Sequence, residues 1–206
     1  LYNSLVISLV TTAVSILVCI MSGYALARFN FRGAGLLSMG TVLIRMVPPV
    51  VVAAPMYVLW TKFGLTGGLS GLVLAYLGLT IPLNVWMLSI FIKEIPFELE
   101  EAAAIDGCSY MRILWGIVVP LIKPGISVTS VFTFRTAWNE FLLAIILSNR
   151  STRTLPAAVS LMISDLGINW GQIMAMATII AIPAFIVTFA CSKNLITGMT
   201  AGAVKG

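Results

Sequence analysis

The chain lacks histidine altogether, and only seven of its 206 residues are acidic. With no histidine and three widely spaced cysteines, the sequence indicates neither a metal site nor a disulfide framework. A glycine-rich phosphate loop ending in Lys-Ser or Lys-Thr is also missing, so we do not expect the chain to hydrolyse ATP itself. The twelve Lys and Arg residues form no patch, which argues against nucleic acid as a partner.

Hydrophobic residues make up 60% of the chain, and charged residues make up only 9%. A soluble domain has roughly 25% charged residues, so this composition indicates a multi-pass membrane protein. Crossing a bilayer takes about 20 apolar residues in a helix. The sequence therefore predicts an all-α transmembrane bundle with five spans, over residues 3–26, 36–60, 69–92, 126–147 and 170–191. Pro48-Pro49 should break the second span, because prolines remove backbone donors.

One long polar stretch, residues 94–120, interrupts the apolar pattern and holds five of the seven acids. We expect two short helices in it, the first with carboxylates in its opening turn, where they complement the helix dipole. Gly107 should close that helix in the left-handed conformation, and Asp106 or Ser109 should cap the second helix, which Pro120 ends. Helices shorter than about 12–15 residues are marginal alone in water, so this pair should need a surface to dock on.

The basic residues predict which way the chain crosses the membrane. One set of loops contains seven of them: Arg28, Arg32, Lys93, Arg112, Lys123, Lys193 and Lys205. The opposite set contains only Lys62, Arg150 and Arg153. We therefore expect the polar stretch and the C-terminus on the cytoplasmic side and Leu1 outside.

The polar stretch resembles the EAA loop of ABC-importer permeases. That loop has Glu-Ala-Ala, then three residues, Gly, nine residues and Ile-x-Leu-Pro. Here the same spacing is met by Glu101-Ala102-Ala103, Gly107, Ile117 and Pro120, with Val119 in place of Leu and Cys108 after the glycine. The alternative is an ordinary interfacial helix, which would not require this spacing.

Further stretches resemble the MalG-like permease subunits of maltose-type carbohydrate importers. They are Phe132-Thr133-Phe134, residues 138–144, Thr154-Leu155-Pro156 and the glycine-rich tail, residues 198–206. The resemblance implies a heterodimer with a second permease subunit, two cytoplasmic ATPase subunits that bind the ATP, an external solute-binding protein and a sugar or oligosaccharide substrate. No cofactor is implied for this chain. The resemblance also implies one permease domain over residues 1–206, with a preceding N-terminal span missing from this fragment.

The resemblance assigns two groups of residues to contacts with the ATPase. The coupling group comprises Glu101, Ala102, Ala103, Asp106, Gly107, Ile117 and Pro120. The tail group comprises Thr200, Gly202, Lys205 and Gly206. In an unrelated protein such a tail would be read as disordered.

Polar residues within the spans predict a path through the membrane. Intramembrane charges are costly and mark functional positions by default. Arg45, Arg135, Asn139 and Glu140 are the candidates, and they could line a watery route for a neutral, hydroxyl-rich solute. The alternative is a structural ion pair between Arg45 and Glu140, because Glu140 is poorly placed for Arg135 on its own helix.

Three other functions remain open at this point. An ion-coupled secondary transporter would use Glu140 as its one intramembrane acid, but no inverted repeat is visible. A structural or assembly membrane protein would not need the EAA spacing. An ABC importer for a solute other than a sugar would share that spacing and differ in its binding protein.

Overall fold

The computed structural model describes residues 1–164 and 167–203, with side chains described for residues 1–162 and 168–191. The longer helices are α1 (Tyr2–Arg28), α2 (Ala34–Leu43), α3 (Pro49–Lys62), α4 (Leu69–Lys93), α5 (Glu98–Ile105), α8 (Lys123–Asn139) and α11 (Trp170–Ala203). The short elements are η1 (Ile44–Met46), α6 (Tyr110–Ile113), the π-helix η2 (Leu114–Val118), α7 (Val119–Leu121), α9 (Leu142–Leu147), α10 (Leu155–Val159), η3 (Ser160–Met162), β1 (Ile163–Ser164) and β2 (Gly167–Ile168).

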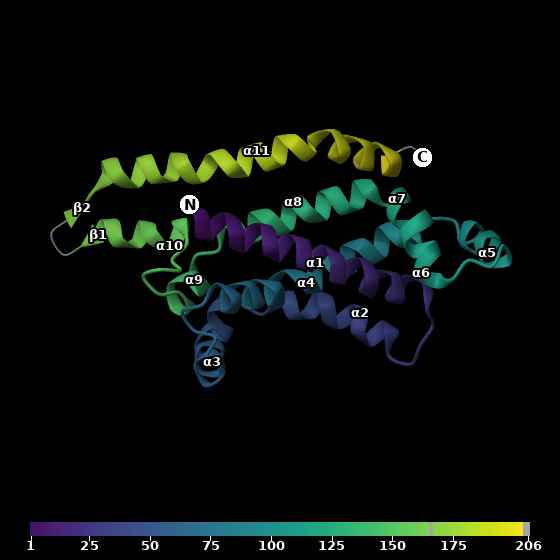
Figure 1. Ribbon diagram of the computed structural model, residues 1–206, viewed down its shortest axis with the longest axis horizontal. Helices are drawn as coiled ribbons and strands as arrows, with labels where there is room; N and C mark the ends of the chain where they lie inside the picture. Colours follow the sequence, from purple (N-terminus) through teal and green to yellow (C-terminus); the bar gives the residue numbers. More distant parts are fainter. Residues whose placement is uncertain (165–166, 204–206) are drawn as a thin grey trace.

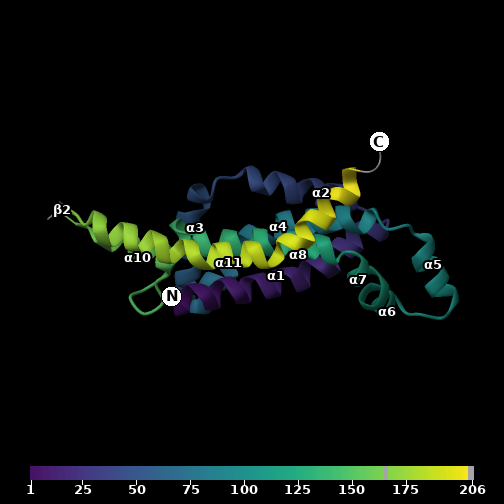
Figure 2. The ribbon, with the colours of Figure 1, turned by 90° about the horizontal axis from the view of Figure 1, so that it is seen from above.

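The molecule is an elongated helical bundle built around α1, α4 and α8, which all pack against one another. Figure 1 shows α1 and α4 running in the same direction and α8 returning between the same two ends. One end collects α5, α6, α7 and the C-terminal end of α11, while α9, α10 and the small β1–β2 hairpin lie at the other (Figures 1 and 2). The predicted all-α membrane bundle is confirmed.

Three helices in the described part of the chain are long and apolar enough to cross a membrane, namely α1, α4 and the Trp170–Cys191 part of α11. They match the first, third and fifth predicted spans. The number rises to five when each of two sharply bent helix pairs is taken as one span. In α4 the helix continues through Pro82, so this proline does not end the span.

The second span breaks where the two prolines predict, and the break is a corner rather than a kink. The segments Ala34–Met46 and Pro49–Lys62 meet at 98°. Pro48 is extended, with ψ at 136°, and Pro49 opens α3 as its first residue. Proline suits that position because its missing N–H would have no helical partner there. As a result, α3 lies across the end of the bundle in Figure 1.

The predicted fourth span, residues 126–147, is wrong in its second half. The helix begins at Lys123, ends at Asn139, and restarts only at Leu142. Glu140 is extended, with ψ at 123°, and its Oε1 accepts a hydrogen bond of 2.8 Å from the Leu143 N–H. A carboxylate that satisfies a free N–H at a helix start makes a break possible without proline. At the other end, α8 meets the preceding helical segment, Tyr110–Leu121, at an angle of 79°.

A buried polar cluster joins the three central helices between two apolar clusters. The Asn84 side chain on α4 donates to Ser15 Oγ on α1 at 2.8 Å and to Thr133 Oγ1 on α8 at 2.7 Å. Thr80 Oγ1 adds a longer contact to Ser15 Oγ at 3.5 Å. All four side chains are buried. Hydrogen bonds between helices are one of the main forces that hold membrane bundles together, because lipid supplies little hydrophobic drive for association.

A small residue, Gly23, lets α1 and α4 approach closely near their shared end. Gly23 is buried, and a Cβ placed on it would lie 3.2 Å from the Ser89 backbone nitrogen and 3.3 Å from Leu88 Cβ. Small residues at such crossings are typical of membrane helix pairs.

Replacing Asn84 should loosen the bundle at its centre. We expect Asn84→Leu to lower the free energy of unfolding in detergent by about 1–2 kcal/mol, because two interhelical hydrogen bonds disappear. The measurement is a denaturation curve in mixed micelles. Asn30→Leu, at an exposed loop position, is the control and should leave the curve unchanged. Equal curves for the two variants would contradict the role given to Asn84.

Candidate functional site

The predicted two-helix loop lies at one end of the bundle, and Gly107 makes its turn. Gly107 has φ of 81°, as predicted. The Cys108 N–H donates to the Ala103 carbonyl and the Gly107 N–H to the Ala104 carbonyl, both at 3.0 Å. This pair of bonds is the Schellman ending of a helix, which satisfies carbonyls that would otherwise lack donors. Ser109 occupies the N-cap of α6 without a side-chain cap bond, so only its position agrees with the prediction.

The first of the two helices, α5, presents different faces to the bundle and to solvent. Glu100 and Ala103 are buried, three residues apart on the inner face. The outer face exposes Glu101, Ala102 and Asp106. The coupling residues named from the sequence therefore do not share one surface, because Ala103 packs inward.

The second part of the loop also differs from expectation. Ile117 is half-buried and packs against the apolar cluster at this end. Pro120 is exposed and lies inside α7, so the helical segment ends at Leu121 rather than at the proline. A five-residue π-helical turn precedes it, where a helix interior normally has α geometry.

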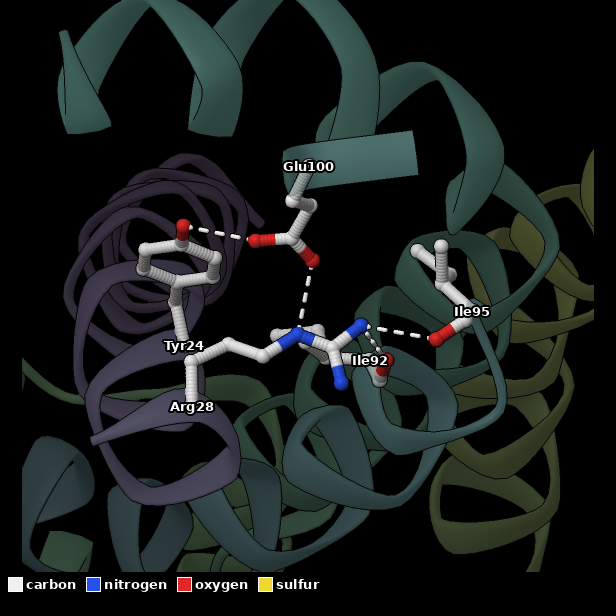
Figure 3. A network of polar contacts seen from close by, with 5 residues as sticks. All are labelled: Tyr24, Arg28, Ile92, Ile95 and Glu100. Atoms are coloured by element: carbon white, nitrogen blue, oxygen red, sulfur yellow. Dashed lines mark hydrogen bonds and ion pairs between the residues drawn. The ribbon is translucent and has the colours of Figure 1, made fainter. Parts of the chain in front are cut away.

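A buried ion pair anchors α5 to the bundle. Arg28 Nε lies 2.6 Å from Glu100 Oε1, and the Tyr24 hydroxyl donates to Glu100 Oε2 at 2.8 Å. Arg28 Nη2 donates to the carbonyls of Ile92 and Ile95, each at 2.8 Å (Figure 3). The exposed fractions of the two charged side chains are 9% and 4%. Because each carboxylate oxygen and the guanidinium have close partners, the charges are paired as buried charges must be.

From the sequence, Glu100 was expected only to complement the helix dipole, and its pairing with Arg28 was not predicted. Glu100 and Arg28 are 72 positions apart, and no local pattern joins them. The spacing within α5 does not single out Glu100 either, because the exposed Glu101 also has an alanine, Ala104, three positions on.

Large apolar side chains surround the anchored helix and face outward. Ile105 is 86% exposed. The others are Phe97, Leu99, Tyr110, Met111 and Trp115. Two of them, Phe97 and Tyr110, line a hollow of about 210 Å³ together with residues that include Arg28, Glu101 and Ala104. Exposed apolar patches of this kind mark surfaces that bind other proteins or membranes.

Of the candidate path residues, Arg45 lies at the corner between α2 and α3. It lines a hollow of about 480 Å³ with apolar residues of α3 and α4, including Met56 and Pro82. Its Nη1 donates to the Leu79 carbonyl at 3.3 Å. The side chain is otherwise uncovered by the described part of the chain.

The remaining path candidates cluster where α8 ends. Arg135 and Asn139 are exposed, and Asn139 Nδ2 donates to the Arg135 carbonyl at 3.0 Å. Glu140 is half-buried, and its Oε1 accepts from the Leu143 N–H. The structural ion pair considered between Arg45 and Glu140 is absent among the described side chains, because Glu140 is engaged at the start of α9.

The tail residues lie only partly within the described chain. Helix α11 continues past the predicted end of the fifth span to Ala203, so Thr200 and Gly202 are part of its backbone. Lys205 and Gly206 lie outside the described residues. The C-terminal end of α11 is at the same end of the molecule as α5 (Figure 1).

The similarity of this chain to known sequences identifies its protein family. Residues 6–200 match the family described as "Binding-protein-dependent transport system inner membrane component". The chain belongs to this family. It is a membrane component of a binding-protein-dependent ABC importer, and the resemblance noted from the EAA spacing is confirmed. Membership of this family implies an ATPase and a solute-binding protein as partners of the permease.

Individual relatives span the permease from end to end. This chain is 34% identical over 207 residues to the sulfoquinovosyl glycerol transport system permease protein SmoH of Agrobacterium fabrum, and the match covers 100% of this chain and 73% of SmoH. It is 33% identical over 205 residues to the diacetylchitobiose uptake system permease protein DasC of Streptomyces coelicolor, covering 99% and 74%.

Among solved structures, the inward-facing MetNI methionine ABC transporter has a similar chain. The TM-score is 0.76 at 18% identity, and the match covers 93% of this chain and 91% of that one. At this identity the likeness supports the fold alone.

A side chain at Gly107 should strain the permease's loop without a clash. A Cβ there would meet no atom within 4 Å, so the cost of Gly107→Ala is the left-handed backbone itself, about 1–2 kcal/mol. We expect ATP-driven uptake to fall when the permease is reconstituted with its partners. Gly107→Asn should fall less, because asparagine tolerates this conformation.

The matched control for this turn is Gly116→Ala. Gly116 also has open space around its Cβ position but lies in the helical segment without a positive φ. Equal uptake losses in the Gly107 and Gly116 variants would contradict the backbone argument.

Proposed function

We propose that this permease is one of two different permease subunits of a sugar or oligosaccharide importer, in the cytoplasmic membrane of a bacterium or archaeon. The sugar class is supported by two relatives, named for sulfoquinovosyl glycerol and diacetylchitobiose, that match nearly the whole chain. ATP would be bound by two partner ATPase subunits, and an external binding protein would deliver the solute. The second permease subunit would cover part of the apolar surface that this chain leaves open.

The observation that supports ATPase docking most directly is the outward face of α5. It presents Glu101, Ala102 and Ile105 beyond the end of the bundle, while Glu100 holds the other face down. Ala102 adds no bulk, so a partner backbone can come close, and Glu101 offers a charge for a basic side chain. Leaving a side chain as apolar as Ile105 in water is unfavourable, and an ATPase groove would remove that area from water.

The orientation follows from the basic residues, which we propose mark the cytoplasmic end. Arg28, Lys93, Arg112 and Lys123 lie at the ends of helices beside α5, and Lys62 and Arg153 lie at the other end. Such an excess of basic residues is typical of cytoplasmic loops. The tail, including Thr200, Gly202, Lys205 and Gly206, would then reach the ATPase interface from α11.

The route of the solute is proposed to pass the corner of the second span. Arg45 in its hollow, with Arg135, Asn139 and Glu140 at the end of α8, offers donors and acceptors to a neutral, hydroxyl-rich solute. The support is chemical: Arg45, Arg135 and Asn139 are uncovered in this chain, and an uncovered charge inside a membrane needs water, a solute or a partner subunit.

An acid placed at Ile105 should prevent docking without harming the fold. We expect Ile105→Asp to abolish co-purification of the ATPase subunits with the permease, because a carboxylate would be buried without a partner in the interface. The measurement is subunit stoichiometry after affinity purification in detergent, with circular dichroism of the permease as the check on folding.

The control for docking is Leu161→Asp, at an exposed apolar position on the opposite end of the bundle. It should leave the ATPase subunits bound. Normal stoichiometry in the Ile105 variant would mean that the ATPase docks elsewhere.

Labelling should distinguish a watery route from buried structural charges. In a background without native cysteines, we expect Arg45→Cys, Arg135→Cys and Asn139→Cys to react with a membrane-impermeant thiol reagent in at least one nucleotide state of the assembled importer. Phe185→Cys, on the uncovered apolar surface of α11, is the control and should stay unreactive in lipid. If the three path positions are also unreactive while transport continues, the route lies elsewhere.

A further inference from the structure

The anchor beneath α5 joins three elements through one side chain. Arg28 belongs to the last turn of α1, binds the carboxylate of Glu100 on α5, and donates to carbonyls at and just beyond the C-terminal end of α4. A cation suits that end of α4, because the unpaired carbonyls of a helix C-terminus carry partial negative charge. The Arg28 guanidinium also lies 5.6 Å from the ring centre of Phe97, the residue that precedes α5.

Few other contacts fix how α5 lies against the bundle. Ala103 is the only buried apolar residue of the helix, and its side chain is a single methyl group. A methyl contact resists separation but not sliding or rotation, because dispersion and apolar burial have no direction. Charge-assisted hydrogen bonds are short and directional, so they fix orientation as well as distance.

We propose that Arg28 and Glu100 are positioning residues that pass the displacement of α5 to α1 and α4 during the transport cycle. The proposal rests on the docking of α5 on an ATPase described above. It adds that Glu100 and Glu101, adjacent in sequence, have separate tasks: Glu101 faces the ATPase, and Glu100 makes the helix rigid with two spans. Tyr24 holds the second carboxylate oxygen and thereby keeps Glu100 from rotating away.

The spans that would move first follow from the same contacts. Helices α1 and α4 are held directly by Arg28, and α8 is tied to both of them through Asn84. The corner formed by α2 and α3 has no hydrogen bond to α5 among the described residues. A push on α5 would therefore reach the three central helices as one body before it reaches the corner that contains Arg45.

A purely stabilising ion pair would give a different result from a transmitting one. Loss of a stabilising pair lowers the yield or the unfolding temperature but leaves each folded complex fully coupled. Loss of a transmitting pair leaves the complex assembled and lowers the number of solute molecules moved per ATP hydrolysed. The ratio of transport to ATP hydrolysis in the complete reconstituted importer therefore separates the two.

The central variant is Glu100→Gln, which keeps the shape of the side chain and removes its charge. We expect the ATPase subunits to stay bound and the ratio of transport to hydrolysis to fall about tenfold, within the range by which coupling networks respond to single substitutions. Tyr24→Phe, which removes one hydrogen bond and keeps the ion pair, should lower the ratio about twofold. It also serves as the test if Glu100→Gln fails to fold.

The matched control is Glu98→Gln, an exposed acid in the same opening turn of α5. Its ratio should equal that of the unmodified importer. A normal ratio in both Glu100→Gln and Tyr24→Phe, with all subunits bound, would overturn the proposal. Loss of the ATPase subunits from Ile105→Asp tests docking separately, so a failure of the docking proposal is seen in stoichiometry and a failure of the transmission proposal in the ratio.

A covalent link provides the positive test. Arg28→Cys with Glu100→Cys, in a chain that also has Cys108→Ser, can be joined by a short bismaleimide. We expect the cross-linked importer to recover a ratio within about twofold of the unmodified one, while the same double variant before cross-linking stays uncoupled. If the cross-linked complex remains assembled and uncoupled, a mechanical role for the pair is excluded.

Discussion

The buried pair of Arg28 and Glu100 is the interaction on which the end of this permease that contains α5 depends. Two charges taken out of water cost several kcal/mol each, and only close, complete hydrogen bonding offsets that cost. Here the offset is nearly complete, because the guanidinium reaches a carboxylate and two carbonyls and the carboxylate also receives the Tyr24 hydroxyl. Removing one partner of such a pair costs about 3–5 kcal/mol, so the pair holds α5 firmly against the ends of α1 and α4.

That interaction explains why α5 can be short and still have a fixed direction. Its eight residues could not stay helical alone in water. The Schellman ending at Gly107 satisfies the last carbonyls, and Glu100 fixes the first turn to α1. The outward face, with Glu101, Ala102, Ile105 and Asp106, is then not needed to hold the helix in place, since the contacts that hold it come from the inner face. Of the two adjacent acids, Glu100 is paired with the bundle and Glu101 faces outward, so the contact that holds the helix leaves its outer face available.

Much of this architecture could be predicted from the sequence, and the failures have physical causes. Long apolar runs predicted α1 and α4 within a few residues and the start of α11 at Trp170, but not its continuation to Ala203, because a bilayer demands only about 20 apolar residues. Pro48 and Pro49 predicted a break but not its 98° angle, which depends on what α3 packs against. The break at Glu140 was missed, because a capping carboxylate in an apolar run gives no signal as plain as a proline. For Arg28 and Glu100, both residue types were noted, but their distance in sequence hid the pair.

Pro82 and Pro183 lie inside α4 and α11, which continue as helices past them. Near each proline, a side chain from a neighbouring element donates a hydrogen bond to a helix carbonyl. A proline has no N–H, so the carbonyl four residues before it, Gly78 for Pro82 and Ile179 for Pro183, loses its helical donor, and no water is available in lipid to replace it. The side-chain donors found here reach the next carbonyl along. In α4, Arg45 Nη1 donates to the carbonyl of Leu79, three residues before Pro82. In α11, Trp138 Nε1 donates at 2.9 Å to the carbonyl of Ile180, three residues before Pro183.

The donors at the two proline sites differ in charge, in burial and in how many N–H groups they leave unused. Trp138 is almost fully buried, so its bond ties α11 to α8 in a span that packs along α8 but has no fully buried residue. Arg45 uses one of its five N–H groups on Leu79 and keeps most of its charge facing the hollow. The side chain that donates beside Pro183 is therefore neutral and buried, whereas the one beside Pro82 is a cation with N–H groups left over. A polar solute or a partner subunit would therefore complete the hydrogen bonding of Arg45, at the corner of the second span, and not that of Trp138.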